Sequence, residues 1–246
     1  MPTPPDNTLR ATFANIGTVQ PADPATWNGK VFLTFDIDWA HDAVIEASID
    51  LVEQAGVPAT WFVTHHTPVL ARLRANPLFE LGIHPNFLPL LMQGSASNGA
   101  TAEEVIDRLL GIVPEAKSVR SHSLVGSGRL LELFRDKGLS HEANAFIPEG
   151  SGMALKPWID WFGMVKVPYC WEDDFWCEAP AGRTPERSGL RGYDFHPIHV
   201  FLNTDRLSRY EAARADFHNP ERLQEHRNRD GNGVGDVLRQ LLGLSA

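Results

Sequence analysis

Segments of strand character alternate with segments of helical spacing along most of this chain, and this alternation limits the possible folds more than any other feature. Seven candidate strands are present: one within 31–39, one at 59–63, one leading into His84, and four at 118–120, 139–143, 163–167 and 190–195. Candidate helices lie at 42–54, 69–75, 101–110 and 129–137. Strands separated by helices pair in parallel through right-handed crossovers, which leaves a barrel or a doubly wound sheet. No Gly-rich dinucleotide loop follows the first strand, so the barrel is favoured.

The length and composition predict a single domain. At 246 residues and 43% hydrophobic composition, the chain can bury one sizeable core. Residues 1–29 are rich in Pro, Thr, Asn and Asp and lack periodicity, so we expect an extended N-terminal arm ahead of one domain spanning 30–246. Residues 221–244 have amphipathic helical character, and such helices could close the barrel or form a dimer contact. The oligomeric state stays open.

The charge and hydropathy of the chain exclude several partners. The net charge is -9 and no Lys/Arg run is present, which argues against nucleic acid or an anionic membrane surface. No run of about 18 apolar residues exists, so we expect no membrane insertion. The N-terminus lacks the basic and apolar regions of a signal peptide. These features predict a cytoplasmic protein whose partner is a small molecule or a glycan.

The first strand ends in two carboxylates. The run from Val31 to Trp39 reads VFLTFDIDW, an apolar stretch that stops at Asp36 and Asp38. Side chains alternate along a strand, so both acids point the same way if the strand continues through them. Barrel enzymes place their chemistry at this end of their strands. Two like charges so close together require a cation.

Further polar motifs follow later apolar runs. They are ELGIHPNF with His84, SVRSHS with Arg120 and His122, VPYCWEDD with Asp173 and Asp174, and YDFHPIH with His196 and His199. In this order, the set resembles the motifs of the carbohydrate esterase family 4 polysaccharide deacetylases, whose first motif reads TFDDG where this chain has TFDID. The resemblance runs from Thr34 to His199, about two thirds of the chain.

The resemblance implies both a fold and an activity. The fold would be a distorted TIM-like (β/α)7 barrel, in agreement with the seven candidate strands. The activity would be metal-dependent hydrolysis of a non-peptide carbon–nitrogen bond. By match to the family motifs, Asp36 would be the general base, Asp38 a metal ligand, and Arg120 the partner that orients Asp36 through a bidentate ion pair.

The second metal motif departs from the family pattern. His84 matches the first histidine of the H-x-x-x-H motif, but Leu88 occupies the position of the second. Leucine cannot bind a metal, so either another residue takes the third ligand position or the metal is bound weakly or not at all. His122 is the first choice, and Asn86 and His65 are second choices, with His65 otherwise a substrate contact. The expected ion is zinc, with nickel, cobalt or manganese as alternatives.

The final motif supplies the general acid. His196 matches the histidine of the family's Leu-x-His motif and would protonate the leaving amine, with a pKa raised by a neighbouring carboxylate. Asp173 is the first candidate for that carboxylate and Asp174 the second. His199 lies three residues beyond His196, so it is either an alternative acid or a substrate contact.

Aromatic side chains near the same motifs bear on the substrate. Trp39 and Trp171, together with Phe87, Phe175 and Trp176, could stack on sugar rings or simply cover the end of the barrel. We therefore predict a hydrolase that removes an acyl group, N-acetyl in the first instance, from an amino sugar or a surface-polysaccharide precursor, as in lipopolysaccharide biosynthesis. The alternatives are a small-amide or formamide hydrolase of the same fold and an inactive sugar-binding barrel.

Overall fold

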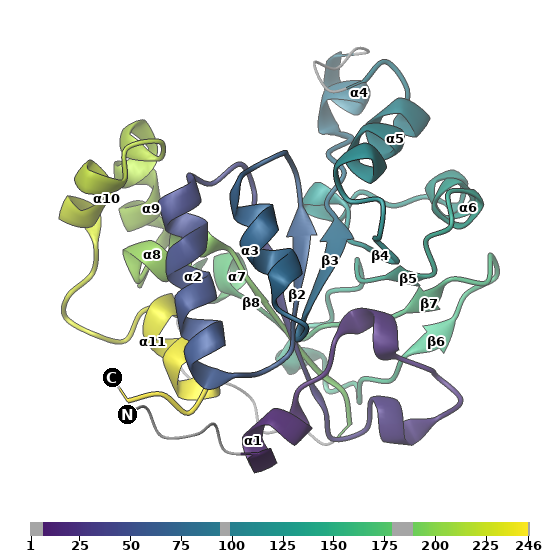
Figure 1. Cartoon of the computed structure of the whole chain (residues 1–246), viewed down its shortest axis with the longest axis horizontal. Helices are drawn as coiled ribbons and strands as arrows, with labels where there is room; N and C mark the ends of the chain where they lie inside the picture. The colour runs from purple at the N-terminus through teal and green to yellow at the C-terminus, as the bar shows by residue number, and fades with distance from the viewer. Residues whose placement is uncertain (1–6, 94–98, 179–188, 246) are drawn as a thin grey trace.

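The computed structural model describes residues 7–93, 99–178 and 189–245. Its centre is a curled sheet of nine strands in the described part of the chain (Figure 1). The strands are β1 (Val31–Asp36), β2 (Ala59–Val63), β3 (Phe79–Ile83), β4 (Ser118–Val119), β5 (His141–Glu142), β6 (Trp158–Ile159), β7 (Val165–Lys166), β8 (Trp171–Glu172) and β9 (Arg191–Phe195). Their order across the sheet is β6-β7-β5-β4-β3-β2-β1-β9-β8. Every neighbouring pair is parallel except β6 and β7.

The mixed α/β architecture agrees with the sequence prediction, but the closed seven-stranded barrel is not confirmed. The two additional strands, β6 and β8, are two residues long and form the two edges of the sheet. No pairing joins these edges among the described residues. The periodicity of so short a strand is invisible in sequence, because alternation needs about four residues to be detected.

Helices connect most of the parallel strands. They are α1 (Asn7–Thr12), α2 (Asp42–Ala55), α3 (Val69–Ala75), α4 (Leu88–Gln93), α5 (Ala102–Ile112), α6 (Gly128–Asp136), α7 (Asp173–Glu178), α8 (Pro197–Leu202), α9 (Leu207–Ala213), α10 (Pro220–His226) and α11 (Val234–Leu241). Local sequence explains several of the ends. The α2 helix stops at Gly56, whose φ of 64° suits glycine, and the Thr101 side chain caps α5 by accepting from the Glu104 amide.

Two apolar layers hold the sheet. Its outer face packs against the helices through residues such as Leu33, Phe35 and Trp61. The inner face carries Phe32, Phe62 and Ala143, among other residues, and it is covered by Ile16, Val19 and Trp27 from the N-terminal segment. That segment, predicted as an extended arm, contains α1 and two 3-10 turns at Ile16–Thr18 and Pro24–Thr26. It lies near the end from which β2 and β3 start, whereas α4 and α5 lie beyond the opposite end (Figure 1).

Two glycines allow aromatic rings to pack within the curl of the sheet. A Cβ on Gly82 would lie 2.7 Å from the Phe62 ring, and a Cβ on Gly192 would lie 2.6 Å from Cβ of Tyr169. Real Cβ atoms do not approach other atoms this closely. Phe62 and Tyr169 can therefore occupy these positions only because residues 82 and 192 are glycines. Among the described helices, none is both long and apolar enough to cross a membrane.

Candidate active site

Strand alternation gathers polar side chains at the carboxyl end of the inner face. Asp36 on β1 lies two positions after Thr34, and Asp194 on β9 is in register with Thr34. His84 and Arg120 directly follow β3 and β4, and His196 directly follows β9. Because neighbouring parallel strands end at the same edge, these groups converge although they come from segments far apart in sequence.

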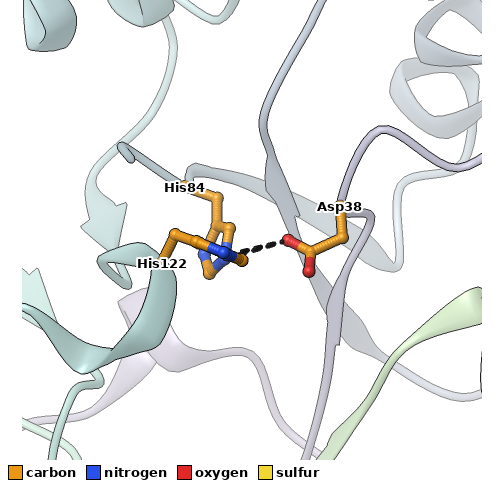
Figure 2. A group of neighbouring side chains, drawn as sticks. All are labelled: Asp38, His84 and His122. Carbon is orange, nitrogen blue, oxygen red and sulfur yellow. Dashed lines mark hydrogen bonds and ion pairs between the residues drawn. The ribbon is translucent and has the colours of Figure 1, made fainter. Parts of the chain in front are cut away.

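Three of the predicted ligands form a compact triangle (Figure 2). Asp38 Oδ1 lies 3.3 Å from His84 Nε2 and 3.2 Å from His122 Nδ1, and the two imidazole nitrogens lie 3.3 Å apart. Asp38 has a φ of 36°, an unusual backbone conformation that turns the chain just after β1. Its Oδ1 atom is buried and accepts no hydrogen bond of good geometry, so this acceptor remains to be satisfied.

The triangle has the dimensions of a metal site. Ligand atoms placed tetrahedrally around zinc at about 2.1 Å are separated by about 3.4 Å, which matches the observed distances. One carboxylate and two imidazoles also form a donor set that zinc prefers, and three protein ligands leave a position for water or substrate. The residues present therefore fit a divalent cation.

The electrostatics of the triangle keep Asp38 ionised. Partial burial alone would raise the pKa of Asp38, but its contacts with His122 and His84 and the nearby His196 outweigh burial and hold that pKa well below its usual range. The reverse influence acts on His122: burial would lower its pKa, whereas the Asp38 carboxylate raises it above the usual value. Asp38 thus offers a full negative charge to a cation.

Beneath the triangle, Arg120 joins two buried acids. Its Nη1 donates to Asp36 Oδ1 at 3.0 Å and also contacts Asp194 Oδ1 closely. The ion pair with Asp36 therefore uses one nitrogen instead of the predicted two. The guanidinium carbon lies 4.7 Å from the ring centre of Phe62 and 4.5 Å from that of Tyr169, so the cation is held between two aromatic faces.

The burial of Asp194 influences its protonation. Burial raises the pKa of Asp194 well above its ordinary value, although the Arg120 charge opposes this. Thr34 Oγ1 donates to Asp194 Oδ1 at 2.8 Å and receives a hydrogen bond from Arg120 at 2.9 Å. Asp36, in contrast, turns its second oxygen towards the triangle, 3.5 Å from His84 Nε2.

Two consecutive acids at the start of α7 each hold one histidine. Asp173, which is fully buried, lies 2.7 Å from His196 Nδ1 and accepts the His196 backbone amide at 2.6 Å. Asp174 lies 2.7 Å from His199 Nε2. Sequence reasoning left the partner of His196 open between these acids; the structure places Asp173 against it.

The partner acids determine the charge of His196. Burial would lower the pKa of His196, but the charge of Asp173 and its hydrogen bond, with smaller effects from Asp38 and Asp174, raise it well above the usual value. The Nε2 atom lies 3.8 Å from Asp38 Oδ2. A protonated imidazole thus faces the triangle, and one of its nitrogens lies within 4.8 Å of a carboxylate oxygen of Asp36.

A pocket of about 290 Å³ opens onto these groups. It is lined by Asp38, His122, Asp174, His196 and His199, by Trp39 and nearby residues after β1, and by Tyr210, Phe217 and His218. Trp39 is 41% exposed and its ring packs edge-on against that of His122. Three rings in tilted contact form one side of the pocket, with ring centres 4.6 Å apart for His199 and Tyr210 and 4.8 Å apart for Tyr210 and Phe217.

The remaining predicted residues lie elsewhere. His65 Nδ1 pairs with Thr64 Oγ1 at 2.8 Å, and Asn86 Oδ1 accepts the Leu88 amide at the start of α4. His65 belongs to none of the groups of His, Cys, Asp and Glu that could hold a metal ion in the described part of the chain. Trp171 is buried and packs on Phe195 with ring centres 4.6 Å apart.

Sequence reasoning missed two contributions to the site. Asp194 stands two residues before His196, a spacing that places both side chains on one face of a strand, so the pattern Asp-x-His was available as a signal. Tyr210, Phe217 and His218 follow the last motif and carry no local pattern that marks them as pocket residues. Their place in the pocket wall follows from how α9 and the residues after it pack in the folded chain.

Comparisons with known proteins identify the family of this chain. Residues 33–214 match the family model of the WbmS-like polysaccharide deacetylases. A solved structure from Bordetella bronchiseptica, described as a candidate polysaccharide deacetylase involved in O-antigen biosynthesis, is 45% identical with a TM-score of 0.89 and covers 95% of this chain and 98% of its own. A candidate polysaccharide deacetylase from Mycobacterium smegmatis has a TM-score of 0.47 at 15% identity, covers 87% and 91% of the two chains, and adds no argument. No curated protein matches the sequence.

The fold is therefore that of a polysaccharide deacetylase, as the sequence motifs predicted. Because the family match spans most of the chain, the protein belongs to the WbmS-like polysaccharide deacetylase family.

Proposed function

We propose that this protein is a metal-dependent hydrolase that removes an acyl group, N-acetyl in the first instance, from an amino sugar of a surface polysaccharide or its precursor. The observation that carries the proposal is the triangle of Asp38, His84 and His122. An oxygen of Asp36 lies 3.5 Å from His84, and Nε2 of a protonated His196 lies 3.8 Å from Asp38. The Bordetella bronchiseptica relative is described in connection with O-antigen biosynthesis, which supports a substrate of this class.

Asp38, His84 and His122 would hold the cation, with zinc as the first choice. A divalent ion at this position supplies Lewis-acid activation of a water and of the amide carbonyl. Asp36 acts as the base that accepts the proton of the attacking water, because its Oδ2 faces the triangle while Arg120 holds its Oδ1. Arg120 fixes the orientation of Asp36, and the two aromatic faces fix Arg120.

His196 acts as the general acid. Its raised pKa keeps the imidazole protonated at neutral pH, and Asp173 fixes the ring so that Nε2 points towards the reacting groups. The proton on Nε2 is transferred to the departing nitrogen as the carbon–nitrogen bond breaks. His199, which Asp174 holds at the pocket wall, would contact the substrate. Trp39, whose ring is partly exposed, would contact it as well.

The test combines metal binding with acyl release. The protein is stripped of metal by a chelator and reloaded with zinc. The probes are N-acetylated and N-formylated hexosamines, both free and as nucleoside diphosphate sugars, and an N-acetylated polysaccharide. Released acetate and formate are measured. We expect stoichiometric zinc, zinc-dependent acetate release, and the loss of both in His84→Ala. The exposed His66 serves as a matched control, because His66→Ala removes an imidazole outside the triangle.

Other outcomes would redirect or overturn the proposal. Release of formate alone would assign the protein to formamide hydrolysis by the same site. Sugar binding that is unaffected by zinc, with no acyl release from any probe, would identify a sugar-binding member of the fold. Full activity in His84→Ala would overturn the assignment of the triangle.

A further inference from the structure

The third candidate ligand, His122, lies on an unusual turn. It begins the 3-10 turn His122–Leu124, in which Ser123 and Leu124 both have positive φ values, 53° and 54°. A positive φ is uncommon for a residue other than glycine and costs about 1–3 kcal/mol each. Two consecutive residues in this conformation persist only where the surroundings hold the turn in place.

The side chain of Asn144, which follows β5, reaches both ends of this turn. Its Oδ1 accepts the Ser121 backbone amide at 2.8 Å, and its Nδ2 donates to Ser121 Oγ at 3.3 Å and to the Val125 carbonyl at 3.4 Å. Ser121 immediately precedes His122 and is fully buried. One amide therefore bridges the residue before the turn and the residue after it.

Other contacts fix only part of the turn. The His122 backbone amide donates to the Pro85 carbonyl at 3.0 Å, and the Trp39 ring lies against the imidazole. The Pro85 contact links the turn to the segment that carries His84, but it does not reach Ser123, Leu124 or Val125. Among the side chains of the described residues, Asn144 is the one whose hydrogen bonds reach both ends of the turn.

We propose that Asn144 is a positioning residue that places His122 within the metal triangle by clamping the two ends of its turn. The inference rests on the proposed metal site and extends it to a residue in none of the sequence motifs.

The experiment measures zinc affinity by titration calorimetry on chelator-stripped protein, together with thermal stability. We expect Asn144→Ala to weaken zinc binding about 10–100-fold, the range found when groups that orient metal ligands are removed. Asn15→Ala is the matched control. The side-chain amide of Asn15 also donates to a backbone carbonyl, that of Leu78 at 3.0 Å, but it lies far from the triangle. Both variants should lower the Tm, and only Asn144→Ala should alter zinc affinity.

A double variant separates positioning from a general structural role. If Asn144 acts through His122, then Asn144→Ala adds little further weakening in a His122→Ala background. Zinc affinity unchanged in Asn144→Ala, or weakened equally in both backgrounds, overturns the clamp. If His84→Ala abolishes zinc binding while Asn144→Ala does not affect it, only the clamp fails. If the wild type binds no zinc, the clamp and the proposed function both fail.

Discussion

The two ends of the inner face of the sheet bury acids in opposite ways. At the amino end, Glu80 on β3 accepts neutral donors: Ser118 Oγ at 2.6 Å and the Gly17 backbone amide at 2.8 Å. At the carboxyl end, Asp38 faces His84 and His122. Burial raises the pKa of Glu80, and its hydrogen bonds only partly oppose this, whereas the imidazoles hold the pKa of Asp38 low despite burial.

This difference shows that the partners, more than burial itself, decide what a buried acid can do. Neutral donors satisfy Glu80 and tie the N-terminal segment to the sheet, which is a structural use. Ionisable partners keep Asp38 at the other end charged, in the wall of a pocket. Substitutions at the two ends should therefore affect different properties, and the following predictions test that division.

The largest effect is expected for Asp36→Asn at the carboxyl end. Asparagine keeps the shape and can still accept from Arg120, but it cannot take a proton from water, so turnover should fall about 10²–10⁴-fold. Zinc affinity should stay close to that of the wild type, because Asp36 is outside the triangle. The measurement is acetate release beside calorimetric zinc titration. Retained turnover would transfer the role of base to another group.

A large loss of stability is expected for Arg120→Met, beneath the triangle at the carboxyl end. The substitution fills similar volume but leaves Asp36 and Asp194 without their buried cation, which should cost about 3–5 kcal/mol of unfolding free energy. Urea denaturation measures this. The control is Arg129→Met, because Arg129 forms a 2.6 Å ion pair with Glu132 while 74% exposed and should contribute little. Equal losses in both variants would contradict the buried role of Arg120.

The smallest effect is expected for Glu80→Gln at the amino end. Folding raises the pKa of Glu80, so the protonated side chain stabilises the folded state. This contribution is fully present below the pKa of the unfolded chain, about 4.3, and is lost as the pH rises through the pKa of the folded protein. The wild type should therefore lose stability relative to Glu80→Gln across this interval. Urea midpoints of the two proteins, followed from pH 4 to 8, test the sign. Parallel curves would contradict it, and turnover should change less than twofold.

The long strands and helices could be predicted from sequence, because their periodicity extends over enough residues to be recognised. The helix expected at 69–75 is the observed α3, and the strand at 59–63 is β2. The strand expected at 139–143 shrinks to His141–Glu142, and β6 and β8 were not predicted. The family motifs also gave the class of protein, since they depend on a few residues in a fixed order.

The site could be predicted only in part. The motifs at the strand ends predicted Asp38, His84 and His122 as metal ligands, and the structure brings these three residues together. The division of labour between Asp173 and Asp174 could not be deduced, because it depends on how α7 faces α8. The links from Asn144 to Ser121 and Val125 join residues about 20 positions apart without any periodic pattern. Such contacts follow from the packing of neighbouring strands, which local sequence does not encode.

The paired acids at the start of α7 have one more consequence. Asp173 anchors His196, and the next residue, Asp174, anchors His199 in the pocket wall, so a single peptide unit supports both the proton donor and part of the surface that a sugar would touch. A ligand that displaces His199 would pull on the same short segment that orients His196. Under the proposed function, binding of the substrate and protonation of its leaving group would be coupled through this segment, and a poorly fitting sugar would both bind more weakly and react more slowly.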